Sequence, residues 1–380
     1  MIELSYDIVI VGGGSAGVSA AVGAAEKGLS VLVVEKSSQL GGQATNVGVG
    51  TICGLYLNDQ KEIFTYNVSR FSEDFAEKIQ EKSQTIPVRN SNGLKFLPYS
   101  VEVFQQHCME TLKEHGVNCF LESELVNASV EKDEVTSIQI KRQGELVKIN
   151  VKSIIDSTGV SCVNELLGEE SISVSFKQTL TQIFTLSNCI FSSEQNLTLI
   201  LMMKLRKENP YNLSVVPGSF SKNKTSFKLN FKERLSKEDI HKAIQSTLLF
   251  LKENSEGFKN AELLSVAQQI GERIGKRPVG KYILTENDVL TCRKFDDSVA
   301  NGNWPIEQWD AEQGLMIKEL KENDFYQIPP KCLESNTYRN LFFAGRNVSA
   351  TDEAIASARV IGVCLQTGFA AGKMAADTLD

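Results

Sequence analysis

The sequence predicts an α/β fold, and three features near its start support this prediction. Residues 7–11 form an apolar run typical of a strand buried in a parallel sheet. A glycine turn, G-x-G-x-x-G over residues 12–17, follows directly. The Ala-rich residues 15–27 predict a helix, and residues 29–34 predict a second buried strand. Strand, glycine turn, helix and strand in this order indicate a Rossmann-like unit that binds a dinucleotide.

Each glycine of the turn has a physical task. Gly12 permits the tight turn, Gly14 lets the backbone approach a pyrophosphate, and Gly17 lets helix and strand pack closely. Ser15 and Ala16 begin the helix, whose free N–H groups and dipole would face the pyrophosphate. We therefore expect these five residues to bind the cofactor. The alternative is a glycine turn with a purely structural role.

An acidic residue ends the second strand. Glu35 lies about 20 residues beyond the glycines, where an acid accepts hydrogen bonds from the ribose hydroxyls of an adenosine. An acid favours a free 2′-hydroxyl over a 2′-phosphate. Glu35 and the adjacent Lys36 are therefore predicted cofactor ligands. FAD and NAD both satisfy the pattern at this point.

A glycine pair follows the acid, at Gly41 and Gly42, with Gln43 next. Here the sequence resembles the FAD-dependent oxidoreductases of the glutathione reductase type. The resemblance implies that Gly41, Gly42 and Gln43 run along an FAD, and that the fold is an FAD-binding Rossmann-like domain. The alternative is a flexible surface loop.

A second stretch that bears on the cofactor is SIIDSTG, residues 153–159. The family has an Ala-Thr-Gly-like turn close to the cofactor here, and Asp156, Thr158 and Gly159 match it with Ser157 in place of Ala. The resemblance implies that Thr158 and Gly159 contact FAD. The alternative is a plain turn at the end of a strand.

The end of the chain is similar to the same family. Residues 341–344 predict a last sheet strand, and residues 354–376 predict a small-residue helix. The family brings the N-terminus of such a helix to the flavin, where its dipole stabilises negative charge on the reduced ring. The resemblance implies flavin contacts at four further residues: Gly345, Arg346, Arg359 and Gly362.

Between these motifs, periodicity predicts several further elements. Helices are expected over residues 59–82, 99–115, 236–251 and 260–270, and strands over 117–121, 126–130, 135–140, 147–151 and 226–231. Residues 126–151 thus predict a β-meander. We expect three segments in the chain: an FAD-binding part at 1–170, an inserted α+β substrate domain at 171–281, and a return to the FAD-binding domain at 282–380.

Composition limits the function. The net charge is −7 with no basic tract, so nucleic acid is not an expected partner. The longest apolar run, residues 197–203, is too short to cross a membrane, and no secretory signal precedes the first strand. Eight cysteines without a C-x-x-C pair predict neither a metal site nor a dithiol redox pair of close sequence neighbours. We expect a cytoplasmic protein, while the oligomeric state is not predicted.

The predicted function is oxidation of a small, anionic organic substrate by hydride transfer to non-covalent FAD. Oxygen or another acceptor would then reoxidise the flavin. A separate nicotinamide domain is not expected, since there is no second G-x-G-x-x-G. Two alternatives remain: a desaturase or monooxygenase, and a non-catalytic flavin-binding assembly or redox-sensing protein.

No catalytic base is evident, and three residues are candidates for the chemistry. Arg273 and Arg277 lie four apart in a segment that resembles a stretch of the family, and they could share a helix face and bind a carboxylate. Either arginine could instead bridge the domains through an internal acid. Cys53 could lie near the flavin, although a buried inert thiol is the simpler prediction.

Other polar residues have structural predictions. Thr285 to Asp288 predicts a helix capping box. His107, His115 and His241 are expected at the surface rather than in catalysis. Trp304 and Trp309 could line a flavin pocket or belong to the core.

Overall fold

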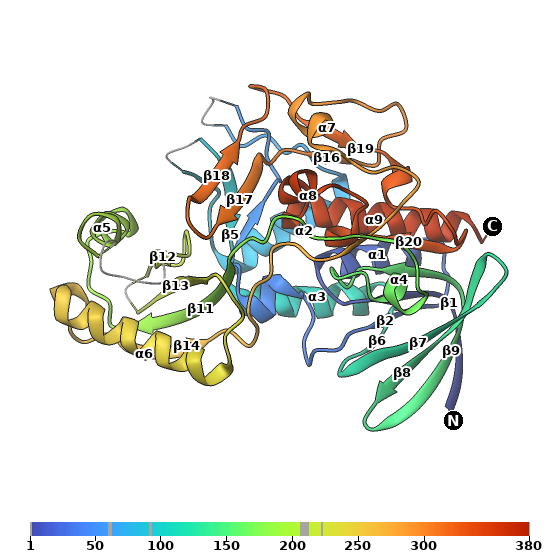
Figure 1. Cartoon of the computed structure of the whole chain (residues 1–380), viewed down its shortest axis with the longest axis horizontal. Helices are drawn as coiled ribbons and strands as arrows, with labels where there is room; N and C mark the ends of the chain where they lie inside the picture. Colours follow the sequence, from blue (N-terminus) through green and yellow to red (C-terminus); the bar gives the residue numbers. More distant parts are fainter. Residues whose placement is uncertain (1, 60–62, 91–92, 206–212, 222, 380) are drawn as a thin grey trace.

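The computed structural model describes residues 2–59, 63–90, 93–205, 213–221 and 223–379. Its centre is a seven-stranded sheet of order β6-β2-β1-β9-β8-β7, with β20 also paired to β9 (Figure 1). The strands β6, β2, β1, β9 and β20 are parallel, and β7 and β8 are antiparallel. Their bounds are β1 Ile2–Val11, β2 Val31–Val34, β6 Asn118–Phe120, β7 Ser123–Glu131, β8 Glu134–Arg142, β9 Glu145–Asp156 and β20 Leu341–Phe343. The α/β class and the Rossmann-like unit are confirmed.

The predicted meander is present, but its third strand does not stop where expected. β9 continues through residues 152–153 and includes residues 154–156 of the SIIDSTG stretch. Its first half pairs antiparallel with β8, and its last three residues pair parallel with β20. Ser153 is fully buried, and its hydroxyl donates to the Asn340 carbonyl at 3.1 Å. A polar residue can therefore lie within this strand without ending it.

The helices cover the sheet. Helix α1 (Ser15–Ala25) packs closely on α9 (Ile361–Asp377), because Gly23 and Gly372 bring the two backbones together: a Cβ on Gly372 would lie 2.0 Å from the Ala20 carbonyl oxygen. The others are α2 Arg70–Ser83, α3 Val101–Glu114, α4 Cys162–Leu166, α7 Glu286–Leu290 and α8 Asp352–Ala358. The capping box of α7 is confirmed, with Thr285 and Asp288 bonded reciprocally.

Two helix predictions at these positions need correction. Helix α2 begins at Arg70 and not at residue 59, since Ser69 caps it by accepting from the Ser72 N–H. The helix predicted over residues 354–376 is two helices, α8 and α9, bent by 95° where Val360 adopts an extended conformation. Within the described ranges no single helix is long and apolar enough to cross a membrane, and this bent pair passes only when its halves are joined.

The segment 171–281 contains a hydrophobic core of its own, whose members include Phe184, Phe227, Leu229 and Ile244. The helices and strands around this core lie at one end of the molecule (Figure 1). A four-stranded sheet of order β12-β13-β11-β14 packs against helix α6. The bounds are β11 Leu180–Ser187, α5 Glu194–Ile200, β12 Ser214–Val215, β13 Lys224–Phe231, α6 Lys237–Asn254 and β14 Glu262–Val266.

One element of this segment differs from its prediction. Residues 260–270 were expected to be helical, but they contain β14, which pairs antiparallel with β11. Four of the five residues of β14 are exposed, so its apolar residues give no clear period. Pairing with β11 decides the conformation there. The prediction that Phe227, Leu229 and Phe231 share one buried face is confirmed.

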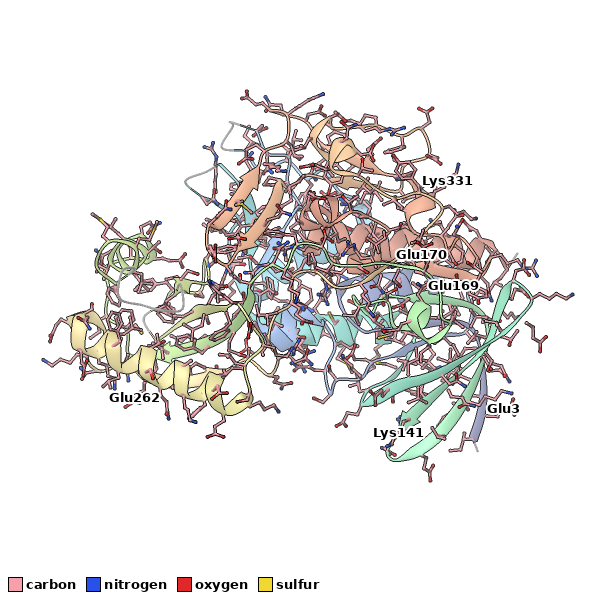
Figure 2. All side chains as sticks on the ribbon, in the orientation of Figure 1. Glu3, Lys141, Glu169, Glu170, Glu262 and Lys331 are labelled. Atoms are coloured by element: carbon pink, nitrogen blue, oxygen red, sulfur yellow. The ribbon has the colours of Figure 1, made fainter. Side chains whose placement is uncertain are left out.

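Short strands complete the fold: β3 Thr51–Cys53, β4 Val88–Arg89, β5 Lys95–Pro98, β10 Ser171–Ile172, β15 Arg277–Pro278, β16 Ala300–Gly302, β17 Ile306–Asp310, β18 Gly314–Lys318 and β19 Tyr326–Ile328. Charged side chains such as Glu3, Lys141 and Glu262 lie at the rim (Figure 2). Arg277 and Lys95 are exceptions, since both are fully buried. His107 is 2% exposed against the Phe75 ring, so its predicted surface position is wrong.

Candidate cofactor and substrate site

The glycine turn after β1 is packed so tightly that side chains are excluded at two positions. A Cβ on Gly17 would lie 1.8 Å from the Gly12 carbonyl oxygen. Gly12 has a φ of +100°, and a Cβ there would lie 2.8 Å from the Ser157 carbonyl oxygen. The turn therefore rests directly against the end of β9. Gly14 differs, because the nearest atom to its Cβ position is 3.8 Å away.

Two further glycine loops meet this turn. The Gly41 N–H donates to the Gly13 carbonyl at 2.8 Å, and a Cβ on Gly42 would lie 2.9 Å from the Gly14 Cα. From the other end of the chain, a Cβ on Gly345 would lie 2.7 Å from the Ala16 Cβ. We call these three loops, residues 12–17, 41–42 and 345, the glycine cradle.

The glycine cradle suits an anionic dinucleotide. Helix α1 has no side-chain cap and no acid in its first turn, so no protein carboxylate competes for its N-terminal N–H groups. Glu35 is 6% exposed and accepts from the Gly13 N–H at 2.6 Å and the Ser37 N–H at 2.7 Å. Lys36 is exposed, and Gln43 begins a π-helical turn, residues Gln43–Val47. Backbone donors and an acid beside them match the requirements of FAD.

The turn after β9 lies beside Arg346. The buried Asp156 carboxylate accepts from the Thr158 N–H at 3.0 Å and from the Thr158 hydroxyl at 2.7 Å. Gly159 has a φ of +76°, and a Cβ there would lie 2.5 Å from the Arg346 guanidinium. Arg346 also donates to the Glu272 carbonyl at 2.6 Å. This guanidinium therefore lies between the turn and residue 272, while its predicted contact with the flavin stays a prediction.

A second region is built from charged side chains. We define the buried charge cluster as Lys228, Arg273, Glu307 and Arg359, each of which is half-buried. The Glu307 carboxylate accepts from the indole N–H of Trp309 at 2.6 Å and from that of Trp304 at 3.0 Å. Burial opposes its ionisation, but Arg359, the two indoles and Arg273 together lower the pKa of Glu307, so it is an anion at neutral pH.

The cations of the buried charge cluster come from separate elements. Arg273 lies 4.9 Å from the Trp309 ring and donates to the Thr179 carbonyl. Arg359 donates to the Glu307 carbonyl at 3.1 Å, while its Nε is buried without a partner in the described structure. Burial and Arg273 lower the pKa of Lys228, with Glu307 opposing. Glu307 is the one carboxylate that acts on the pKa of all three cations.

The start of α9 links the two regions. A Cβ on Gly362 would lie 2.8 Å from the Cys53 carbonyl oxygen, so α9 begins directly against β3. Burial, followed by Glu307, raises the pKa of the Cys53 thiol to about 12. The thiol is therefore protonated at neutral pH, and a thiol nucleophile needs the opposite shift.

The two candidate arginines are not equivalent. Arg277 is fully buried and donates to the carbonyls of Ala350 and Gly275 and to the Asp352 carboxylate. Arg273 instead belongs to the buried charge cluster. The expected common helix face is wrong, because the stretch from Gly271 to Lys276 is not helical and Arg277 lies in β15.

Sequence reasoning missed two members of the buried charge cluster. Lys228 and Glu307 lie in β13 and β17, far from any motif. Trp304 and Trp309 were noted as possible pocket residues, and their spacing around Glu307 is the one local hint. Contacts between residues about 80 positions apart have no signal in a single sequence.

Cradle, acid and carboxy-terminal helix together define a dinucleotide-binding protein of the Rossmann type. Residues 7–189 and 193–380 match the model of the family described as FAD dependent oxidoreductase, so the chain belongs to that family. The family description names FAD as the cofactor and oxidation–reduction as the class of chemistry. The match supports this family in general and does not single out the glutathione reductase type.

Individual relatives are distant. Digeranylgeranylglycerophospholipid reductase 1 of Methanococcoides burtonii is 28% identical over 160 residues, which are 41% of this chain and 38% of that protein. This chain therefore spans well under half of that relative. A solved geranylgeranyl bacteriochlorophyll reductase-like protein of Thermoplasma acidophilum has a TM-score of 0.54 at 14% identity, covering 99% of this chain and 78% of that one. The flavin-dependent brominase Bmp2 has a TM-score of 0.52 at 14% identity, covering 99% and 79%. These structures share the fold.

Proposed function

We propose that the protein oxidises a small organic anion by hydride transfer to non-covalently bound FAD, with oxygen or another acceptor regenerating the cofactor. The observation that carries this proposal is the charge balance of the buried charge cluster. Glu307 is the carboxylate that acts electrostatically on three half-buried cations, Lys228, Arg273 and Arg359. An excess of partly desolvated cations is costly unless an anion neutralises it.

Each residue of the cluster has a proposed task. The guanidinium groups of Arg273 and Arg359 bind the acidic group of the substrate, since their planar forks suit a carboxylate. Glu307 fixes Arg359 and the two indoles, and Trp304 and Trp309 keep water from the reacting carbon. FAD supplies the hydride acceptor when bound. Arg346, Thr158 and Gly159 are proposed to contact the flavin side of the same space.

The segment 171–281 is proposed to be the substrate domain. It contributes Lys228 and Arg273, whereas Glu307 and Arg359 come from the returning chain. Arg277 is proposed to act as a structural link, because its three acceptors are all internal. Arg273 and Arg277, which the sequence did not distinguish, therefore have different proposed roles.

The test is anaerobic mixing of the FAD-loaded protein with each member of a library of small carboxylates. Bleaching of the flavin absorbance measures its reduction. Arg273→Met and Arg359→Met should each lower the apparent affinity or reduction rate by more than about tenfold, because a buried charge-assisted contact is worth about 2 to 5 kcal/mol. Lys276→Met is the control, since Lys276 forms an exposed ion pair with Glu165. Reduction by neutral compounds only, or unchanged kinetics in both arginine variants, would contradict the proposal.

The monooxygenase alternative has its own outcome in this assay. Rapid flavin reduction by micromolar NADPH would favour it, because the predicted absence of a nicotinamide domain implies slow, weakly saturable oxidation of NAD(P)H.

A further inference from the structure

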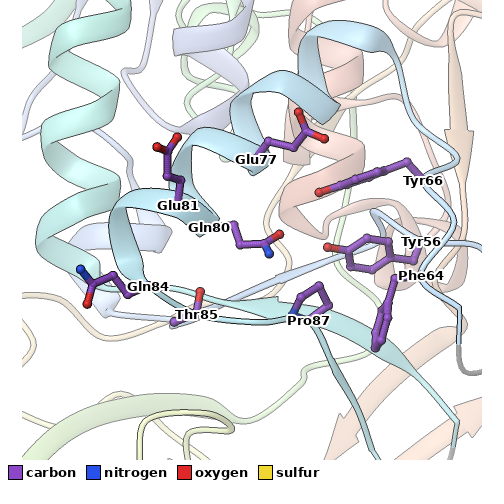
Figure 3. Close-up of a pocket in the computed structure, with 9 residues that line it drawn as sticks. All are labelled: Tyr56, Phe64, Tyr66, Glu77, Gln80, Glu81, Gln84, Thr85 and Pro87. Atoms are coloured by element: carbon purple, nitrogen blue, oxygen red, sulfur yellow. The ribbon is translucent and has the colours of Figure 1, made fainter.

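A cavity of about 560 Å³ lies between helix α2 and the loop that follows β3 (Figure 3). Its lining contains no residue of the glycine cradle or of the buried charge cluster. It is therefore separate from the site described above. The lining residues are Tyr56, Phe64, Tyr66, Glu77, Gln80, Glu81, Gln84, Thr85 and Pro87.

Tyr56 has an unmet hydrogen-bonding group in this cavity. The residue is 1% exposed, and its hydroxyl lies near the Tyr66 hydroxyl but forms no hydrogen bond of good geometry in the described structure. Figure 3 shows the hydroxyl pointing toward the space between Tyr66 and Gln80. Burial raises the pKa of Tyr56, so the hydroxyl keeps its proton. A buried hydroxyl without a partner costs free energy that a bound polar group would recover.

The charged side chains among the described lining residues are both acidic. Glu77 and Glu81 lie one turn apart on α2 at the exposed side of the cavity (Figure 3). The basic residues of α2 are engaged elsewhere: Arg70 pairs with Asp74, Lys78 with Glu114, and Lys82 with Glu110. Among the described residues that line the cavity there is no Lys or Arg. The wall therefore favours a cation.

Aromatic rings form the opposite wall. The ring centroids of Tyr56 and Phe64 are 5.3 Å apart, and those of Tyr56 and Tyr66 are 4.9 Å apart. Faces of such rings attract ammonium groups, most strongly where water is excluded. Lys95 lies 5.8 Å from the Phe64 centroid, but Asp59 binds its ammonium at 2.5 Å and Lys95 does not line the cavity.

We propose that this cavity binds a small organic ammonium ion. Its charge would be held between the two glutamates and the aromatic rings, and a hydroxyl or N–H group on the ligand would bond the Tyr56 hydroxyl. An acidic wall alone would bind any cation, whereas the rings and the unpartnered hydroxyl favour an organic one.

Isothermal titration of the FAD-loaded protein with choline and with ethanolamine tests this proposal. The neutral isostere of choline, 3,3-dimethylbutan-1-ol, is titrated in parallel, and NaCl keeps the ionic strength constant. Saturable binding of either amine, with at least about fivefold weaker binding of the isostere, is expected from a cation–π contact of about 1 kcal/mol or more. No saturable binding of either amine, or equal affinity for the isostere, would overturn it.

Variants locate the binding. The double variant Glu77→Gln, Glu81→Gln should lower amine affinity about fivefold or more, and Tyr56→Phe should lower it about threefold while keeping the ring. Glu253→Gln, an exposed acid on α6, is the matched control and should not change it. Unchanged affinity in the double variant would place the amine elsewhere and refute the assignment. Flavin reduction by the substrate is measured on the same samples, so failure here is distinguishable from failure of the proposed oxidoreductase activity.

Discussion

The glycine cradle and the buried charge cluster are built differently, and we propose that they recognise different ligands. The cradle uses backbone groups, and its residues matter mainly because they lack side chains: a Cβ on Gly17 would lie 1.8 Å from a carbonyl oxygen. The cluster uses charged side chains from β13, β17, the segment before β15 and the junction of α8 and α9. The cradle therefore fits a group shared by all members of the family, whereas the cluster can change with the substrate.

This contrast has an energetic counterpart. Backbone N–H groups at a helix start bind a phosphate without bringing a buried net charge of their own. The cluster holds three half-buried cations and one half-buried carboxylate, an arrangement that needs compensation from internal hydrogen bonds or an anion. Substitutions in the two regions should therefore fail in different ways.

The largest expected effect comes from a buried arginine outside both regions. Arg277→Met leaves the Asp352 carboxylate buried without its cation, which should cost about 3 to 5 kcal/mol of unfolding free energy. Chemical denaturation measures this loss, with Lys276→Met expected to cost less than about 1 kcal/mol. If Arg277→Met retained full stability but its flavin were no longer reduced by the substrate, Arg277 would belong with the buried charge cluster. Its assignment as a purely structural residue would then be wrong.

A pair of glycine substitutions sharpens the description of the glycine cradle. Gly17→Ala should destabilise the fold by about 3 kcal/mol and abolish FAD binding, because no space exists for the methyl group. Gly14→Ala should keep the stability of the apoprotein but weaken FAD binding, since its Cβ points into open space where the pyrophosphate would approach. Denaturation of both apoproteins and FAD titration check the two expectations. Equal stability loss in both variants would show that Gly14 is only structural.

The pH dependence of stability reports on a buried ionisable group that serves neither region. Burial lowers the pKa of His107 from 6.5 to about 4, so the folded protein holds it neutral while the unfolded chain protonates it. Stability should fall as the pH drops from 6.5 to 4, by up to about 3 kcal/mol from this residue. His107→Leu should remove that part of the slope in denaturation curves measured across this range. An unchanged slope would mean that His107 is solvated in solution.

The smallest effect is expected at Cys53, where the two regions meet. FAD should be released from the chain by acid denaturation, and Cys53→Ser should leave FAD content unchanged, because a thiol with its pKa raised to about 12 is not a nucleophile at neutral pH. Flavin that stays with the denatured wild-type chain and is lost from Cys53→Ser would show a covalent link.

The sequence predicted the glycine cradle well because its information is local. Gly12, Gly14, Gly17 and Glu35 follow one another within a strand–turn–helix–strand unit, and backbone geometry demands those residue types in that order. The start of α7 was predicted for the same reason, since a capping box spans four residues. The division of β9 between an antiparallel and a parallel neighbour was not predictable, because Ser153 is satisfied by Asn340, which lies 187 residues later.

The buried charge cluster was only partly predictable. Arg273 and Arg359 were named from their resemblance to the family, but Lys228 and Glu307 alternate with apolar residues inside ordinary strands. Their charge becomes significant only when β13 and β17 face one space. Arg277 shows the converse. Its position in a segment that resembles the family suggested that it binds the substrate, but its partner is Asp352. That residue is 75 positions away and could not be found from spacing.

The close contact of α1 with α9 has a consequence for biosynthesis. Gly345 and α9 leave the ribosome long after residues 12–17, yet they complete the glycine cradle and cover the buried face of α1. The emerging chain therefore exposes that apolar helix until α9 docks, and we expect cofactor loading to follow the synthesis of α9. Nascent chains stalled before Leu341 should consequently be chaperone clients without flavin, however long they are held.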